Sequence, residues 1–304
     1  MKHLRIPIIL SIAAALFTLG LKFTAWFLTS SVGLLSDAME SCVNLLAAVT
    51  AYFSLWYAAR PVDRTHTYGH EKIEFFSSGL EGALIMVAAA GIIYAAGLRL
   101  IAPVELESLG LGTLVCAVAA AINFGVALVL LRVGKRHDSI VLEADGQHLM
   151  TDVLTSVGVI FGLGIVLLTE KQWPDAVVAI LVAFNILWTG FTLVRRSLNG
   201  LMDHALTDEE QAQLRAIITE QCEPGTTFHA LRTRRGGSRR FGDCHLLVPG
   251  TWTVKRGHDL AERIEQAIRD KMSGLELTLH IEPIELQTSW QDSELLRLER
   301  EQGG

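Results

Sequence analysis

Two apolar stretches of this chain carry polar residues in matching places: SDAMESCVNLLAAVTAYFSL at 36–55 and ADGQHLMTDVLTSVGVIFGL at 144–163. They align without a gap, and Asp37 matches Asp145 while Leu46, Val49, Phe53 and Leu55 match identical residues of the second stretch. The chain therefore contains an internal repeat whose polar positions are in register.

Each stretch places its polar residues on one helix face. The first has Asp37, Glu40 and Asn44 at i, i+3 and i+7, and the second has Asp145, His148 and Asp152 at the same spacing. Ionisable groups inside an apolar helix are costly, so by default they indicate a functional site.

Six apolar runs are long enough to span a membrane, since a spanning helix needs about 20 residues. The first begins with a basic segment but is too long for a signal peptide and lacks a small-residue cleavage site. The sequence thus predicts a polytopic α-helical membrane protein with both termini on one side. The expected spans are 6–29, 31–59, 73–101, 110–133, 139–168 and 173–194.

Basic residues predict the orientation. Arg99 and Lys171 flank one side of the predicted spans, and ten basic residues flank the other. By the positive-inside rule we expect both termini to be cytoplasmic, in the inner (plasma) membrane. The ten residues are Lys2, Arg5, Arg60, Arg64, Lys72, Arg132, Lys135, Arg136, Arg195 and Arg196.

Four polar residues are expected near the membrane midplane. A rise of about 1.5 Å per residue places Glu40 about 14 Å and Asn44 about 20 Å from the outer edge, and His148 and Asp152 about 14 Å and about 20 Å from the inner edge. Together they offer N/O donors with a net negative charge, which suits a divalent cation. The alternative is that they only hydrogen-bond helices together.

Further ionisable residues in the predicted spans include Lys22, Asp37 and Glu81. Lys22 and Asp37 fall at similar depth, so we expect a structural ion pair, because a partner lowers the cost of a buried charge. Glu81 is unassigned: it faces the pathway or extends toward the inner surface.

The segment between the second and third spans reads RPVDRTHTYGHEKIE at 60–74. Its Asp63, His66 and His70 are close enough in sequence to hold one metal ion. The alternative is a solvated basic loop. His70 and Glu71 do not begin a metalloprotease motif, because HExxH would need histidine where Glu74 stands.

Charged residues become denser after residue 200. Residues 201–304 contain 13 Lys and Arg and 18 Asp and Glu, against 13 and 14 in the first 200. We expect a helix from about 207 to 222, strands at 228–233 and 241–248 around a Gly236-Gly237 turn, a helix at 253–272 and a strand at 275–283. This order, αββαβ, predicts an α+β domain with both helices on one face of the sheet.

We accordingly divide the chain into a six-helix transmembrane domain at 1–200, a cytoplasmic domain with candidate metal ligands at 201–287, to which the family resemblance described below adds a dimerisation role, and a polar tail at 288–304. His229, His245, His280 and Glu282 fall on the three strands, and His280 and Glu282 share a face. Four ligands from adjacent strands could converge on one ion. The alternative is scattered surface histidine.

The net charge of −6, without a basic stripe, argues against nucleic acid as a partner. Cys42, Cys116, Cys222 and Cys244 have no ligand spacing, so we interpret them as packing residues. A hydrolase is disfavoured because no nucleophile and base accompany the histidines.

The segments SSVGLLSDAMESCVN at 30–44, RPVDRTHTYGHEKIE at 60–74 and EADGQHLMTDVLTSVGV at 143–159 resemble the cation diffusion facilitator family. The second half also looks like that family's metallochaperone-like cytoplasmic domain. The resemblance implies a non-enzymatic homodimer in membrane lipid that exports a cytosolic divalent metal in exchange for protons, similar to the bacterial ferrous-iron/zinc efflux members.

The resemblance also assigns sites, and it pairs Lys72 with Asp203 near a dimer interface. The family usually has Asp or His at the position of Glu40, and Asp at the position of Asn44. Glu282 stands where Asp is common in close relatives. The family's sites fall on Glu40, Asn44, His148 and Asp152 at the midplane, on Asp63, His66 and His70 in the loop, and on His229, His245, His280 and Glu282 in the cytoplasmic domain.

We expect Zn²⁺ to be the transported ion, with the cytoplasmic site as a regulator. The alternatives are an exporter of Fe²⁺, Mn²⁺ or Co²⁺, because oxygen-rich sites suit harder ions, with Cd²⁺ as a further possible ion. An alternative from another class is a membrane metal receptor that does not transport.

Overall fold

The computed structural model describes residues 5–29, 32–101, 111–169 and 173–290. The chain divides into two compact units, Met1–Leu201 and Met202–Gly304. Each unit is described by itself below.

The first unit consists of six long helices, as the hydropathy pattern predicts. Two of them extend past their predicted ends, at 133 and 194. The last turns of α6 remain helical despite Arg195 and Arg196 because Ser197 and Gly200 still pack on Phe75 of α3. The helices are α1 (Arg5–Thr29), α2 (Val32–Ala58), α3 (Ile73–Ile101), α4 (Leu111–Arg136), α5 (Ile140–Thr169) and α6 (Trp173–Leu201).

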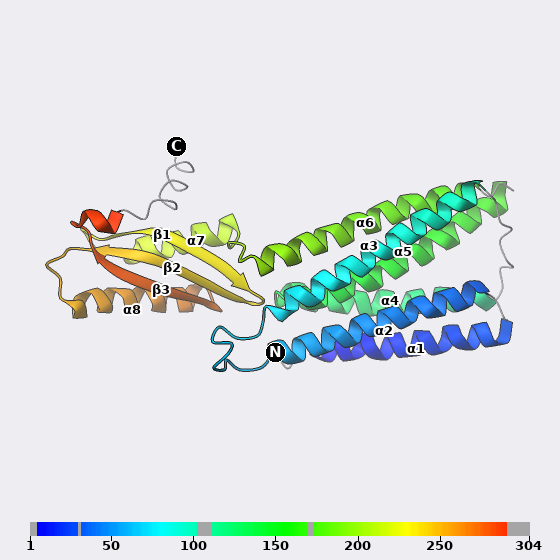
Figure 1. The fold of residues 1–304 in the computed structure, drawn as a ribbon, viewed down its shortest axis with the longest axis horizontal. Helices are drawn as coiled ribbons and strands as arrows, with labels where there is room; N and C mark the ends of the chain where they lie inside the picture. The colour runs from blue at the N-terminus through cyan, green and yellow to red at the C-terminus, as the bar shows by residue number, and fades with distance from the viewer. Residues whose placement is uncertain (1–4, 30–31, 102–110, 170–172, 291–304) are drawn as a thin grey trace. The chain divides into compact units, whose positions relative to one another are not determined.

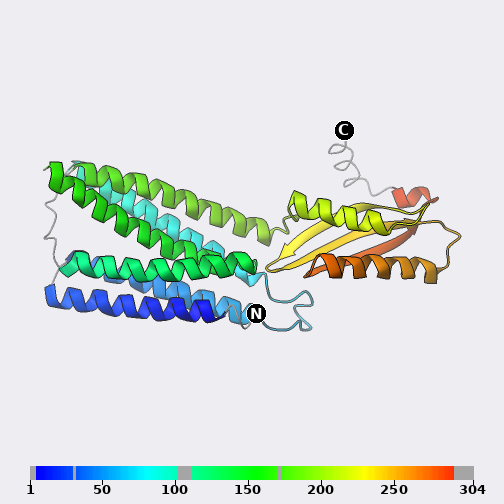
Figure 2. The same ribbon diagram turned by 180° about the vertical axis from the view of Figure 1, so that it is seen from behind.

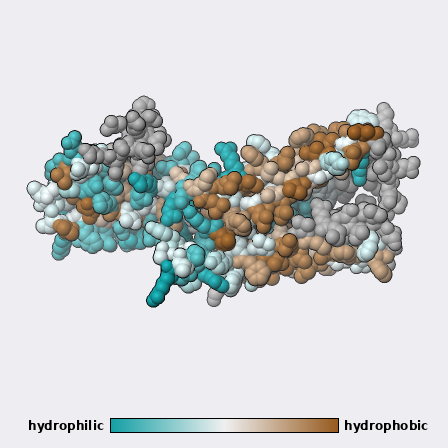
Figure 3. All heavy atoms as spheres, viewed as in Figure 1, coloured by the Kyte–Doolittle hydropathy of each residue, from teal (hydrophilic) through white to brown (hydrophobic). Residues whose placement is uncertain are grey.

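Four of these helices, α1, α3, α4 and α6, are long and apolar enough to cross a membrane within the described residues. The other two, α2 and α5, contain the two repeated stretches with polar residues. Hydrophobic side chains cover much of the visible surface of the bundle (Figure 3). An apolar outer surface is what a membrane-spanning bundle presents to lipid.

The helices lie in two groups, α1 with α2 and α4, and α3 with α5 and α6 (Figures 1 and 2). Contacts of α5 with α2 and α4 join the groups. Helices α3 and α6 approach closely at Gly82 and Gly190, where a Cβ atom on either glycine would lie about 3 Å from the other's carbonyl oxygen. Small residues at such crossings let helix backbones pack directly.

One end of the bundle is defined by the loop at 59–72 and is called the loop-side end below. There Ser54 Oγ donates to the Ile73 carbonyl oxygen at 3.2 Å, and Ser139 Oγ donates to Glu74 Oε2 at 3.1 Å. The second contact aligns the start of α5 with the start of α3, so depth along both helices can be counted from it.

The second unit has the predicted order αββαβ. Helix α7 begins with a capping box in which Thr207 and Glu210 each accept a hydrogen bond from the other's backbone amide. Strands β1 and β2 pair antiparallel, and β2 and β3 pair parallel. The elements are α7 (Asp208–Gln221), β1 (Thr227–Gly236), β2 (Arg239–Val248), α8 (Val254–Lys271), β3 (Leu275–Pro283) and the 3₁₀ helix η2 (Gln287–Trp290).

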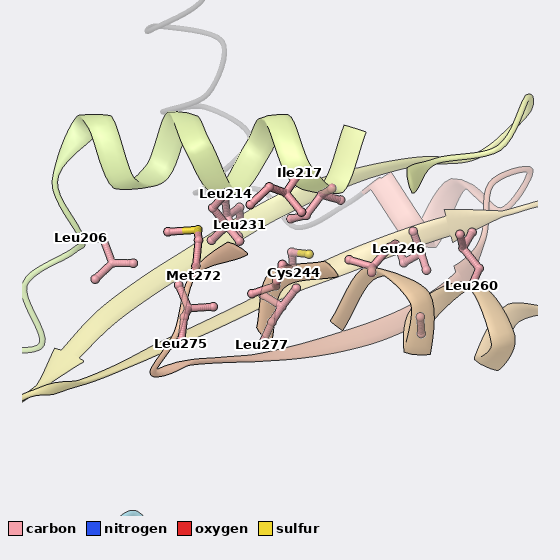
Figure 4. Close-up of a cluster of buried hydrophobic side chains, with 14 of the residues drawn as sticks. Leu206, Leu214, Ile217, Leu231, Cys244, Leu246, Leu260, Met272, Leu275 and Leu277 are labelled. Atoms are coloured by element: carbon pink, nitrogen blue, oxygen red, sulfur yellow. The ribbon is translucent and has the colours of Figure 1, made fainter. Parts of the chain in front are cut away.

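The core of this unit lies between the two helices and one face of the sheet (Figure 4). Leu214 of α7 and Leu277 of β3 both approach Gly242, and Ile281 of β3 approaches Gly257 of α8. Alternate residues of each strand point away from the helices. The opposite face therefore carries the even-numbered positions of β3, which include Glu282.

Two features of this unit differ from the prediction. Both strands of the hairpin are longer than predicted, because they continue to a two-residue turn at Gly237, whose φ is 68°. The 3₁₀ helix η2 was not predicted. Most of the expected polar tail, 291–304, lies outside the described residues.

Candidate functional site

The deep polar residues of α2 and α5 meet inside the bundle. Asn44 and His148 are 8% and 7% exposed, and His148 Nε2 lies 2.7 Å from Asn44 Oδ1. The Asn44 amide nitrogen donates a hydrogen bond to Asp152 Oδ2. Asn44 thus links the two residues that sequence analysis placed beside it.

These contacts fix the hydrogen positions. A carboxylate oxygen only accepts, so the Asn44 amide nitrogen faces Asp152 and its oxygen faces His148. The His148 Nε2 atom therefore carries a hydrogen and donates it. In this arrangement Nε2 has no lone pair free for a metal ion, so metal binding at Nε2 requires that this hydrogen leave the atom.

Two expectations fall on side chains outside the described part of the chain. The backbone of α2 includes Asp37 and Glu40, but their side chains are not described. The place of Glu40 in the site and the pairing of Asp37 with Lys22 stay predictions. Lys22 itself is buried.

The loop residues Asp63, His66 and His70 offer ligand atoms that all lie within 4.8 Å of one another. Asp63 Oδ1 accepts from the backbone nitrogens of Thr65 and His66 at 2.7 and 2.8 Å, and Asp63 Oδ2 lies 3.2 Å from His70 Nε2. The His70 ring is buried against Tyr57, with the ring centroids 4.8 Å apart. The turn at Asp63 therefore presents both imidazoles to one carboxylate.

The same turn determines the charge of Asp63. Hydrogen bonds from the Thr65 hydroxyl and from the backbone amides of His66 and Thr65 hold the pKa of this carboxyl well below its usual range. The carboxylate stays ionised at neutral pH and is exposed, so a cation can reach it from solvent.

In the second unit, Glu282 stands between three histidines. Its Oε2 lies 3.8 Å from His229 Nε2 and 3.4 Å from His245 Nδ1, and its Oε1 lies 3.4 Å from His280 Nε2. The cross-strand register explains this, because His229 is the partner of His245 on β1 and β2, and His245 is the partner of His280 on β2 and β3. Of these candidate ligands, His229, His245 and Glu282 offer atoms that all lie within 4.8 Å of one another.

Among the described residues, this group contains buried polar atoms without a hydrogen-bond partner. They include Nδ1 and Nε2 of His229 and Oε2 of Glu282. Buried polar atoms are normally satisfied. An ion bound between His229 Nε2 and Glu282 Oε2 would satisfy these two atoms, so the donor set fits a metal such as zinc.

Sequence analysis missed Trp290, which covers this cluster. Its ring lies 5.5 Å from the His229 ring, centroid to centroid, and its Nε1 donates to the Ile284 carbonyl oxygen at 2.9 Å. Ser289 Oγ also donates to the Pro283 carbonyl oxygen at 2.9 Å. A tryptophan in an otherwise polar tail was the available signal, but its position depends on the turn after β3.

The expected Lys72 and Asp203 pair joins residues of different units and stays a prediction. Within its own unit, Asp203 lies 3.3 Å from Arg234.

Comparison with known proteins gives two family matches. Residues 8–202 match the model of the cation efflux transmembrane domain, and residues 206–284 match that of the cation efflux protein cytoplasmic domain. The chain is 49% identical to the uncharacterized transporter sll1263 of Synechocystis sp., with 93% of this chain and 91% of the relative covered. It is 28% identical to the cation-efflux pump FieF of Shewanella oneidensis, with 92% and 94% covered.

Among solved structures, the metal-bound C-terminal domain of the CzcD transporter from Thermotoga maritima is 26% identical. That match covers 27% of this chain and 99% of the domain, with a TM-score of 0.24. The two family matches together cover nearly the whole described chain. The chain therefore belongs to the cation efflux family, the cation diffusion facilitators, and is a membrane transporter of cations.

Proposed function

We propose that this transporter exports divalent metal from the cytoplasm in exchange for protons, with Zn²⁺ as its first substrate, through a site formed by Asn44, His148, Asp152 and Glu40. The observation that carries the proposal is the link from His148 through Asn44 to Asp152 across two helices. These groups are N and O donors that belong to the repeated stretches and lie deep in the bundle.

His148 is the main proton carrier in this scheme. In the proton-loaded carrier the His148 ring is an imidazolium. Loss of its Nε2 proton releases one proton and leaves a neutral imidazole whose Nε2 can bind the metal, and the Asn44 amide must turn so that its oxygen replaces its nitrogen toward the ion. When the bundle rocks to face outward, protonation of His148 expels the ion and resets the carrier.

The other parts of the proposal concern orientation, regulation and ion capture, and they rest on the sequence and on the two further clusters. The excess of basic residues on one side supports cytoplasmic termini in the inner membrane. The cluster at His229, His245, His280 and Glu282 senses cytosolic metal and tightens a homodimer, the commonest symmetric assembly. The loop cluster at Asp63, His66 and His70 captures ions near the cytoplasmic surface.

The test is transport into inside-out proteoliposomes supplied with Zn²⁺, Cd²⁺, Co²⁺, Fe²⁺ or Mn²⁺. We expect Zn²⁺ uptake with proton efflux in the wild type and none in His148→Ala. The matched control is His204→Ala, which removes an exposed histidine of the second unit and should transport normally. Equal transport by His148→Ala and the control would refute the site.

A second candidate is an exporter of Mn²⁺, Fe²⁺ or Co²⁺. The observation in its favour is Asn44, which offers the site an oxygen atom. Glu40 and Asp152 are also oxygen donors, so His148 is the single nitrogen donor of the proposed set. Transport of these ions without Zn²⁺ would select this candidate. Metal binding without any transport would instead identify a membrane receptor.

A further inference from the structure

Several buried oxygen-bearing side chains of the first unit lie outside the proposed transport site, and three of them come from the neighbouring helices α1, α3 and α5. Ser11 of α1, Glu81 of α3 and Asp145 of α5 are 0%, 3% and 2% exposed. Ser11 Oγ, Glu81 Oε1 and Asp145 Oδ2 are buried without a hydrogen-bond partner of ordinary geometry. Leaving such atoms unsatisfied is costly, so their arrangement calls for a ligand.

Asp145 interacts with both of the other side chains. Asp145 is the charged group that acts on Glu81, and the Ser11 hydroxyl lies beside Asp145. Helix α5 packs against both α3 and α1, which brings the three residues together from three helices. The other charged groups that act on Asp145 are His148 and Asp152, further along its own helix.

The position of this group follows from the Glu74 and Ser139 contact at the loop-side end. Counting about 1.5 Å per residue from that contact, Glu81 lies about 10 Å and Asp145 about 9 Å into the bundle. On the same count His148 lies about 14 Å and Asp152 about 20 Å deep. The group therefore stands between the loop-side end and the proposed transport site.

We propose that Ser11, Glu81 and Asp145 form a second cation-binding subsite, which holds a divalent metal ion on its way between the loop-side end and the transport site. All its donors are oxygens, and the two carboxylates supply negative charge in a place where charge is otherwise expensive. Hard divalent cations such as Mn²⁺ suit this donor set.

The subsite also accounts for the neutral residue at position 44. Asn44 leaves the transport site with fewer negative charges than a carboxylate would give, and Glu81 and Asp145 restore attraction for a cation along the approach. This inference rests on the proposed function for the direction of ion movement, but the binding of a cation to the subsite does not depend on transport.

The experiment measures Mn²⁺ binding to the full-length protein in detergent by the electron paramagnetic resonance signal of free Mn²⁺. In the starting variant, alanine replaces His66 and His70 of the loop cluster and His229 and His245 of the cytoplasmic cluster. Asp152→Asn removes the transport site. We expect one Mn²⁺ per chain to remain bound. Adding Glu81→Gln should abolish this binding, and adding Glu81→Asp should retain it.

Two further variants make the result specific. Glu74→Gln removes a buried carboxylate seven residues nearer the loop-side end of the same helix and should leave binding unchanged. Ser11→Ala keeps both carboxylates and should weaken Mn²⁺ binding about tenfold, as loss of one supporting oxygen does.

Absence of Mn²⁺ binding in the starting variant would overturn the subsite, and so would binding that persists with Glu81→Gln. Failure of the proposed function has a different result: the wild-type protein would bind Mn²⁺ but would transport no ion in proteoliposomes.

Discussion

Asn44 of α2 donates a hydrogen bond to Asp152 of α5, the residue that occupies the same position in the second copy of the internal repeat. The two copies thus meet at equivalent positions 108 residues apart. An amide and a carboxylate can share this hydrogen bond at neutral pH, whereas two carboxylates would require a proton or a cation between them.

Replacing Asn44 by Asp should therefore change the proton coupling. We expect Asn44→Asp to release about one more proton per metal ion bound, because the added carboxylate is protonated in the empty site and ionised in the loaded one. The ratio of proton flux to metal flux in proteoliposomes measures this. An unchanged ratio would show that Asn44 is not at the metal.

Asp63 should have two separate roles in the loop: its oxygen holds the turn by hydrogen bonds, and its negative charge binds metal. In Asp63→Asn the side-chain oxygen still accepts from Thr65 and His66, so the turn is retained while the charge is lost. In Asp63→Ala both are lost. We expect both variants to bind metal more weakly at the loop, but only the alanine variant to be cleaved faster by trypsin after Arg64, which lies within the turn. Equal cleavage of the two variants would contradict this role.

Trp290 should report metal binding by the cytoplasmic cluster. Its ring lies against His229, so Zn²⁺ added to the full-length protein should change the tryptophan fluorescence, and Trp290→Phe should remove most of that change although five other tryptophans remain. Trp290→Ala should weaken Zn²⁺ binding roughly tenfold, the usual effect of losing a residue that supports a ligand. The control is Trp252→Phe, which alters a tryptophan that stacks on Arg256.

Glu210 gives the second unit a pH-dependent contribution to stability. Partial burial raises the pKa of this carboxyl, but hydrogen bonds from Arg235, the Thr207 backbone and Arg240 outweigh it, so the pKa is lowered from its ordinary value of 4.5. A lowered folded-state pKa stabilises the fold above pH 4.5, and the contribution is lost as pH falls through the folded value.

Glu210→Gln should therefore lower the free energy of unfolding of this unit by about 1 kcal/mol at pH 7, through the loss of charge-assisted hydrogen bonds and part of the capping box. The difference from the wild type should shrink below pH 4.5. Urea unfolding of the detergent-solubilised chain at several pH values measures it. Glu209→Gln, on the exposed side of the same turn, should have little effect at any pH.

Hydropathy and periodicity were sufficient to predict the six helices and the order αββαβ. Such patterns depend on the chemistry of neighbouring residues, which the sequence states directly. The ends of α6 and the hairpin were less predictable, because they depend on residues far away in the sequence. Ser197 of α6 contacts Phe75, and Arg240 of β2 pairs with Leu275 of β3.

The groupings of candidate ligands were also predictable, since depth and strand alternation can be counted. The direction in which a side chain points could not be derived by counting along the sequence. Nothing local shows that Asn44 turns its nitrogen to Asp152, that Ser11 approaches Asp145, or that Trp290 covers His229, because each depends on how distant elements pack.

The most direct test of the transport site records metal and proton flux in the same inside-out proteoliposomes, with Asp152→Asn as the variant. The control is Asp138→Asn, which makes the same change just before α5, at a residue whose φ of 52° asparagine readily adopts. The account predicts that wild type and control exchange Zn²⁺ for protons and that Asp152→Asn does neither. Zn²⁺ flux through Asp152→Asn at the control's rate would contradict it.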